Sequence, residues 1–326
     1  MANKQDFDVT NPVTITLAPG VSDDWRRYQN PDPWIMEHEG MYYCYTTGDG
    51  IDILTSTDLK TFTHMGTQRI AGSTDSHWDP FMLKHNGKFY LYYSANDGTG
   101  DAWPSPNRMQ VADADSPLGP FRHVRRLFDH WAIGHHLYEK DGNLYMFYNE
   151  KGQCPGGAGD GTLTYLIKMK DPYTPDITTK RLVVWGTHQQ EKYPGGDYCV
   201  EGPRYFEHEG VGFLMYSGGP WESEDYWVGY ATCDAAQPLE NAEFTKYPDN
   251  HTYHPILTRD EKLYSMGRST FIKGPKGEML LAYHANTRNG SAIPGLPHGD
   301  KQFRRLCVNP FEIVEGRKIV VAPNQY

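Results

Sequence analysis

Residues 79–93 read DPFMLKHNGKFYLYY, a stretch in which two apolar segments are joined by a short turn. The turn ends at Gly87, and glycine accepts the positive φ angle that a tight hairpin turn needs, so the stretch predicts a β-hairpin. Four other stretches have the same design, and they begin at residues 32, 134, 202 and 269. In all five stretches the turn glycine lies eight positions after the start.

The spacing of these hairpins predicts the fold. Their starts are 47, 55, 68 and 67 residues apart, which is enough for one four-stranded unit with loops of variable length. Further short strands are predicted between the copies, as at residues 50–56 and 226–232, and no helical period longer than two turns is present. We predict an all-β fold, a five-bladed β-propeller that forms a single catalytic domain over residues 1–326, with the first strand of each hairpin next to the central axis.

Composition and charge exclude several classes of partner. The chain of 326 residues has a net charge of −10, whereas binding to nucleic acid or to an anionic membrane needs a basic patch. No run of 18 apolar residues is present, so no helix is predicted to span a bilayer. The first eight residues, MANKQDFD, lack the apolar segment of a secretory signal, which predicts a cytoplasmic location; the alternative is a secreted protein whose signal has been removed.

Charged residues stand at or beside four of the five hairpin starts, namely Asp32, Asp79, Glu201 and Arg268. Charged side chains rarely begin buried strands without a partner or a function. Carboxylates that converge on one pocket repel each other and raise at least one pKa, as general acid–base catalysis requires. An Asp-Pro pair can also be a simple strand-entry turn, in which the aspartate caps backbone amides. The recurrence at one repeat position favours a catalytic role for Asp32 and Glu201, the two carboxyl groups that glycoside hydrolysis needs.

Five sets of motifs support this interpretation. In chain order they are NPDP at 30–33, TGDGIDILTSTDL at 47–59, VEGP at 200–203, GRS at 267–269 with YHA at 283–285, and RLCVNP at 305–310. Together they resemble glycoside hydrolase family 43, which contains arabinanases, α-L-arabinofuranosidases and β-xylosidases. The resemblance implies a five-bladed propeller that inverts the anomeric configuration, with Asp32 as the general base and Glu201 as the general acid.

The sequence departs from the family pattern in three blades. The family has a third carboxylate in blade three, but residues 133–138 read IGHHLY, so Gly134 stands in its place. In blade two the usual Trp-Ala-Pro reads WDP at residues 78–80, which adds Asp79 to the ring. In blade five the usual histidine after Gly267 is Arg268. One carboxylate has therefore been lost from the ring, and another has been gained.

These changes lead to a hypothesis about how the acid is tuned. We expect Asp79 or His135 to take over the tuning role, and Arg268 to balance the added negative charge. The family histidine is often linked to an ion in the channel, so Arg268 puts a structural Ca²⁺ or Na⁺ ion in question. No cofactor is expected to be required, and no catalytic metal site is predicted, because the histidines lack the spacing of three metal ligands.

Substrate contacts are predicted from aromatic and polar residues near the ring. The candidates are Trp78, His136, Arg268, Trp221 and Arg305. A histidine pair such as His135-His136 is also typical of core packing with a backbone hydrogen bond. Insertions at residues 97–107 and 152–161 are long enough to close one end of a cleft, which favours exo action.

The resulting hypothesis is an inverting exo-glycosidase that releases α-L-arabinofuranosyl residues from plant-type oligo- or polysaccharides. The motif TGDGI at residues 47–51 resembles the arabinan-active members most. One alternative is a β-xylosidase or another exo-glycosidase on the same scaffold. A second alternative is a propeller that binds glycans without cleaving them, which the loss of the aspartate at position 134 favours and the presence of both Asp32 and Glu201 opposes.

Overall fold

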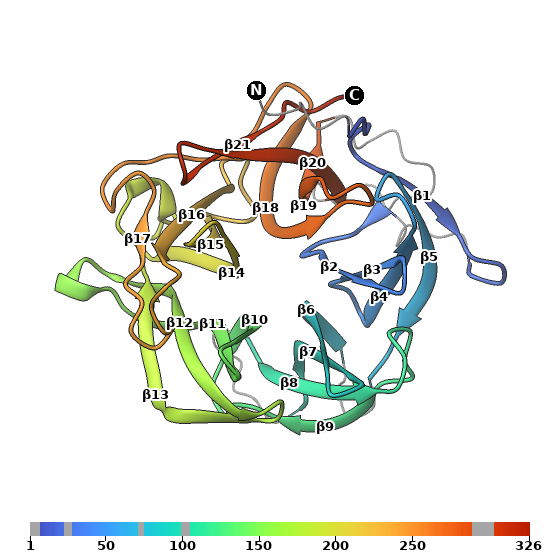
Figure 1. Ribbon diagram of the computed structural model, residues 1–326, viewed down its shortest axis with the longest axis horizontal. Helices are drawn as coiled ribbons and strands as arrows, with labels where there is room; N and C mark the ends of the chain where they lie inside the picture. The colour runs from blue at the N-terminus through green and yellow to red at the C-terminus, as the bar shows by residue number, and fades with distance from the viewer. Residues whose placement is uncertain (1–6, 23–27, 71–74, 99–104, 289–302) are drawn as a thin grey trace.

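The computed structural model describes residues 7–22, 28–70, 75–98, 105–288 and 303–326 (Figure 1). Within these residues the regular structure is almost entirely β, with strands β1 to β21. Helical structure in the same residues includes two single 3₁₀ turns, η2 (Pro155–Gly157) and η3 (Gln189–Glu191). The all-β prediction is confirmed. None of the described helices has the length and apolar character needed to cross a membrane.

The strands follow one another in five antiparallel groups. The first group is β2 (Trp34–His38), β3 (Met41–Thr46), β4 (Ile51–Ser56) and β5 (Thr61–Gln68), with β1 (Thr14–Leu17) parallel to β5. The second is β6 (Asp75–His85), β7 (Lys88–Asn96), β8 (Asn107–Ala114) and β9 (Arg122–Arg126). The third is β10 (Ala132–Lys140), β11 (Asn143–Gln153), β12 (Asp160–Asp171) and β13 (Thr174–Val184). The fourth is β14 (Tyr198–His208), β15 (Val211–Gly218), β16 (Trp227–Asp234) and β17 (Thr245–Lys246). The fifth is β18 (Leu263–Lys273), β19 (Met279–Thr287), β20 (Arg304–Val314) and β21 (Lys318–Val321).

The groups lie around a common centre. Figure 1 shows β2, β6, β10, β14 and β18 nearest the middle, with the later strands of each group farther out. In the described residues, hydrogen bonding joins the strands into four sheets that do not merge into one closed sheet. The third and fourth groups share a sheet because β12 and β14 pair in parallel over two residue pairs.

Each predicted hairpin is present as the first two strands of a group. Their turn glycines all have positive φ angles: Gly40 (78°), Gly87 (79°), Gly142 (73°), Gly210 (82°) and Gly277 (86°). In four of the turns the preceding residue also has a positive φ, which is the geometry that matches the twist of a two-residue hairpin. Local turn chemistry therefore explains where each group begins.

Aromatic side chains fill the spaces between neighbouring groups. Tyr45 of the first group and Tyr93 of the second are fully buried in one cluster. Tyr92 of the second group and Tyr148 of the third are fully buried in the next. Sheets packed face to face need large side chains to fill the layer between them. The high aromatic content of the sequence is thus largely used in the core.

The innermost strands share a backbone feature that aims side chains at the centre. At or near the start of each of them, a residue at the repeated position has a positive φ: Asp32 (54°), Asp79 (58°), Gly134 (68°), Gly202 (65°) and Arg268 (54°); β6 and β18 contain one more such residue each, Ser76 and Ser265. The register of the strand pairing shifts there in β6, β10, β14 and β18, as in a β-bulge. Three of the five residues are not glycine, and each such conformation costs about 1 kcal/mol or more. This backbone strain recurs at one position of the repeat, close to the common centre of the five groups.

The N-terminal segment connects the last group to the first. The Asn11 amide nitrogen donates to the Val308 carbonyl (3.0 Å) and to Asn309 Oδ1 (2.7 Å), and Asn11 Oδ1 accepts from the Val308 N–H (2.9 Å). Strand β1, which follows, pairs with β5 of the first group. In addition, the Thr270 hydroxyl of β18 donates to the Pro33 carbonyl just before β2 (2.8 Å). These bonds hold the first and fifth groups together.

We expect Asn11→Ala to weaken the fold, because it leaves buried hydrogen-bonding groups of β20 without partners. The free energy of unfolding, measured with urea, should fall by about 2–4 kcal/mol. Asn143→Ala is the control, since the Asn143 amide contacts only the Asp141 carbonyl at an exposed turn. A loss no larger than that of the control would show that the segment does not hold the ring together.

Candidate active site

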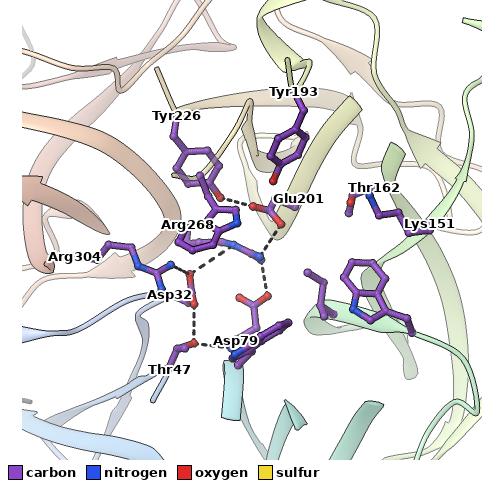
Figure 2. A pocket seen from close by; sticks show the side chains of 14 residues that line it. Asp32, Thr47, Asp79, Lys151, Thr162, Tyr193, Glu201, Tyr226, Arg268 and Arg304 are labelled. Atoms are coloured by element: carbon purple, nitrogen blue, oxygen red, sulfur yellow. Dashed lines mark hydrogen bonds and ion pairs between the residues drawn. The ribbon is translucent and has the colours of Figure 1, made fainter. Parts of the chain in front are cut away.

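A pocket of about 320 Å³ lies at the centre of the ring (Figure 2). Its volume is in the range of small-molecule sites. All five strand groups, or the loops next to them, contribute to its walls. The lining residues are Asp32, Thr47, Trp78, Asp79, Trp131, Ile133, Lys151, Thr162, Tyr193, Glu201, Trp221, Tyr226, Arg268 and Arg304.

The Arg268 guanidinium is the centre of the pocket's charge network. Its Nη1 lies 2.6 Å from Asp79 Oδ2, its Nη2 donates to Glu201 Oε2 (3.0 Å), and its Nε lies 3.7 Å from Asp32 Oδ1. Figure 2 shows the three carboxylates pointing toward this group from different parts of the chain. Both carboxylates that the sequence predicted as catalytic, Asp32 and Glu201, therefore lie in one pocket, where they interact with different nitrogens of one guanidinium.

Asp32 is held as a carboxylate. The Thr47 hydroxyl donates to its Oδ2 (2.6 Å), and Arg304 Nη1 lies 3.5 Å from its Oδ1. Burial raises the pKa of Asp32, but the charges of Arg304 and Arg268, together with the Thr47 bond, outweigh burial and lower the pKa to about 2. Asp32 is thus ionised at neutral pH, as a general base must be before it reacts.

His284 holds the backbone of Asp32 as a neutral imidazole. The Asp32 backbone N–H donates to His284 Nδ1 (3.0 Å), which requires an unprotonated Nδ1. Burial lowers the pKa of His284 to about 3, and the nearby Arg304 charge acts in the same direction. The imidazole is therefore neutral, with its proton on Nε2. Its YHA motif was noted in the sequence, but its contact with the backbone of Asp32 was not foreseen.

Asp79 has the opposite environment to Asp32. Its side chain is almost completely buried, at 1% exposure. Burial raises the pKa of Asp79 to about 6 against the opposing charge of Arg268, and the negative charges of Asp32 and Glu201 also raise it. Near neutral pH the proton of this network is thus found on Asp79 far more readily than on Asp32.

Both carboxylate oxygens of Glu201 accept hydrogen bonds. The Tyr226 hydroxyl donates to Oε1 (2.8 Å), and Arg268 donates to Oε2 (3.0 Å). Burial raises the pKa of Tyr226 well above its usual value, so the phenol keeps its proton and acts as a donor. Tyr226 lies just before β16 and was not identified from the sequence, because no motif surrounds it.

Tryptophan side chains form much of the apolar wall. Trp78 and Trp221, two of the candidates for substrate contact, line the pocket, and so does Trp131. The Arg304 guanidinium lies 5.0 Å from the centre of the Trp221 ring, and the Ser265 hydroxyl donates to the Trp221 carbonyl (2.7 Å). These contacts fix one aromatic face beside Asp32, where a sugar ring can pack against it.

The two adjacent histidines belong to the core and not to the pocket wall. His136 Nε2 bonds to the Tyr205 carbonyl (3.0 Å), and its ring meets Trp34 and Phe81 edge to face. Burial lowers the pKa of His135 to about 3, so it is neutral at physiological pH. His136 is therefore not among the residues that line the pocket, and His135 is neutral; the roles predicted for the two histidines stay predictions.

Arg304 lines the pocket in the place expected for Arg305. Neighbouring residues of a strand point to opposite faces, so only one of two adjacent arginines in β20 can face the pocket. The Arg305 guanidinium instead lies 5.0 Å from the centre of the Tyr28 ring. The sequence motif marks the strand and not its register, so it does not decide between the two arginines, and a substrate contact of Arg305 stays a prediction.

The centre of the ring does not fit a channel cation. Among the residues that the structure describes, no group of three or more His, Cys, Asp or Glu side chains could hold a metal ion. The Arg268 guanidinium lies among the three carboxylates and would repel a Ca²⁺ or Na⁺ ion there. Arginine thus supplies, as part of the chain, the positive charge that these carboxylates need.

The raised pKa of Asp79 predicts a dependence of stability on pH. In the unfolded chain an aspartate has a pKa of about 3.9, so the stabilising contribution of neutral Asp79 is complete below that pH and is lost as the pH rises through about 6. We expect wild type to lose about 2–3 kcal/mol relative to Asp79→Asn between pH 4 and pH 8. Urea unfolding of both proteins across this range measures the difference. Parallel curves would contradict the buried, raised aspartate.

Buried carboxylates of contrasting pKa beside tryptophan side chains are typical of enzymes that act on carbohydrates. Residues 26–317 match the family model of "Glycosyl hydrolases family 43". The chain belongs to this family.

Individual relatives are distant. The chain is 24% identical over 320 residues to an extracellular exo-α-(1→5)-L-arabinofuranosidase of Streptomyces avermitilis; the match covers 90% of this chain but 62% of that protein. It is 22% identical to a probable arabinan endo-1,5-α-L-arabinosidase C of Aspergillus clavatus, with 84% of this chain and 88% of that protein covered. A crystal structure of a thermostable family-43 glycoside hydrolase superposes with a TM-score of 0.76 at 25% identity, covering 98% of this chain and 97% of that chain.

Proposed function

We propose that the chain is an inverting glycoside hydrolase that releases α-L-arabinofuranosyl residues from plant-type oligo- or polysaccharides. The observation that carries the proposal is the sharing of one guanidinium by Asp32 and Glu201 within one pocket. We further propose that each strand group is one blade of a five-bladed propeller, and that residues 1–326 form one catalytic domain. The five antiparallel groups around a common centre support this architecture.

In the proposed reaction Asp32 is the general base. It is ionised, and its carboxylate lines the pocket, where it can accept a proton from a water that attacks the anomeric carbon. Glu201, reached from another strand, donates a proton to the leaving oxygen. Inversion requires these groups on opposite sides of the bond, with room for the water.

Asp79 supports the acid through the arginine that they share. Arg268 contacts both Asp79 and Glu201, so a change in the charge of Asp79 changes how strongly the guanidinium interacts with Glu201. The missing family aspartate at Gly134 is thereby compensated from the neighbouring blade. This role is the hypothesis that the sequence raised for Asp79, now argued from contacts.

The arabinofuranosyl specificity is supported by the names of the relatives, which include both exo- and endo-acting arabinan enzymes. Lys151 and Thr162, at the two ends of the insertion between β11 and β12, line the pocket and support a closed, exo-type site. The Streptomyces avermitilis relative is named an extracellular enzyme, which favours the secreted alternative over the cytoplasmic location predicted from the N-terminus.

Hydrolysis of nitrophenyl α-L-arabinofuranoside and β-D-xyloside tests the proposal. We expect the arabinofuranoside to be the better substrate, with kcat/KM lowered about 10²–10⁴-fold in Asp32→Asn on this glycoside and in Glu201→Ala on methyl α-L-arabinofuranoside, whose leaving group needs a proton. Proton NMR of the first product should show the inverted anomer. Full activity in both variants would rule out the assigned acid and base, and no turnover of any arabinofuranoside or xyloside would favour a glycan-binding module.

The role of Asp79 predicts a shifted pH–rate profile. In Asp79→Asn the carboxyl group whose pKa burial raises to about 6 no longer titrates beside Arg268. The limb of the kcat/KM profile near pH 6 should therefore shift or disappear. Asp113→Asn, which removes a surface partner of Lys88, is the matched control and should leave the profile unchanged. An unshifted limb in Asp79→Asn would refute the tuning role.

A further inference from the structure

Asn149 is a buried polar residue of β11 that the proposed mechanism does not yet use. Its side chain has no exposed surface. Two of its hydrogen bonds run to the neighbouring strand β12, where Nδ2 donates to the Leu163 carbonyl (3.2 Å) and to the Thr164 hydroxyl (3.0 Å). The amide plane is therefore held in one orientation from the side of the third strand group.

The remaining bonds of Asn149 reach the backbone on both sides of Glu201. Nδ2 donates to the Val200 carbonyl (3.1 Å), and Oδ1 accepts from the Gly202 N–H (2.8 Å). One side-chain amide thus contacts two strand groups, with the two Nδ2 hydrogens shared among three acceptors. A buried amide whose donor and acceptor atoms are both paired fixes position strongly, because removing it leaves buried polar groups unpaired.

The backbone beside Glu201 needs such a partner. The pairing of β14 with β15 is regular up to Glu201 and Ser217, then shifts before Arg204. A bulge of this kind leaves backbone groups outside the ladder. The Asn149 side chain supplies the partner that the Gly202 N–H lacks in the irregular segment, and so takes over a function normally performed by a neighbouring strand.

Gly134 leaves the space that the Asn149 side chain occupies. A Cβ atom at position 134 would lie 2.3 Å from Asn149 Oδ1 and 3.3 Å from Arg268 Nη1. The first distance is far inside van der Waals contact, so a side chain at position 134 and the Asn149 amide exclude each other. The glycine that replaces the expected aspartate is thus required by the amide that holds the Glu201 segment.

We infer that Asn149 is a positioning residue for Glu201: it holds the 200–202 backbone so that the carboxyl group meets the leaving oxygen of the substrate. This inference rests on the proposed function, since it assigns Asn149 to the acid of that reaction. It also gives the Gly134 substitution a cause within this chain.

The test uses two arabinofuranosides that differ only in the leaving group. The 2,4-dinitrophenyl glycoside leaves without a proton, whereas the methyl glycoside depends on the general acid. In Asn149→Ala we expect kcat for the methyl glycoside to fall about 100-fold, kcat for the dinitrophenyl glycoside to change less than about 3-fold, and KM values to stay within about 2-fold. Asn149→Asp keeps the acceptor for the Gly202 N–H and loses the donor hydrogens. Its ratio of kcat for the dinitrophenyl glycoside to kcat for the methyl glycoside should therefore fall between those of wild type and Asn149→Ala.

Gly134→Ala provides an independent arm, because its Cβ would displace the Asn149 amide, and it should show the same dependence on leaving group. Gly142→Ala is its matched control, since Gly142 has a similar φ of 73° on the same hairpin but open space around its Cβ. Asn309→Ala, which removes another buried amide far from the pocket, controls for general loss of stability.

Equal losses on both glycosides in Asn149→Ala and Gly134→Ala, or no loss in either, would overturn the inference. Failure of wild type to hydrolyse either glycoside would instead overturn the proposed function, so the two failures are distinguishable.

Discussion

One guanidinium group, that of Arg268, makes the rest of the site possible. Three carboxylates converge on it from β14, from β6 and from the segment before β2. Burial of three negative charges without a partner would cost far more than the stability of a domain, and a paired cation removes most of that cost. Burial alone would lower the pKa of Arg268, but the charges of Asp79 and Glu201 raise it well above its usual value, so the cation is permanent.

The same network separates the properties of carboxylates that lie close together. Asp32 has two arginines and a hydroxyl beside it, and it stays ionised into acidic solution. Asp79 is more deeply buried and faces two like charges, so it accepts a proton near neutral pH. One cation shared unequally thus leaves two side chains of the same chemical type with different pKa values, a contrast that is typical of pockets in which acid–base chemistry takes place.

Much of this arrangement was predictable from local chemistry, and the rest depends on register and packing. Turn glycines such as Gly142 are required by backbone geometry, so the hairpins and the all-β class could be read directly. Asp79 stood out because it begins a hairpin at the same repeat position as Asp32 and departs from the family pattern there. The choice between Arg304 and Arg305 depends on which face of β20 points inward, which a motif does not encode. Asn149 carries no sequence signal, because its role arises only when β11 and β14 are brought together.

The hydrogen bonds of Asn11 also bring the two ends of the described chain close together. Thr10 pairs with Gln325, the Asn11 N–H donates to the Gln325 carbonyl, and Figure 1 shows both ends at the same edge of the ring. The order of the strand groups around the centre would therefore stay the same if the chain began and ended at another point, as in a circular permutation. A short peptide could join these ends, and new ends could be placed in a hairpin turn such as the one at Gly142, with every strand group keeping its neighbours. Modules fused to either end would emerge side by side, which suits a scaffold that carries accessory units on one edge.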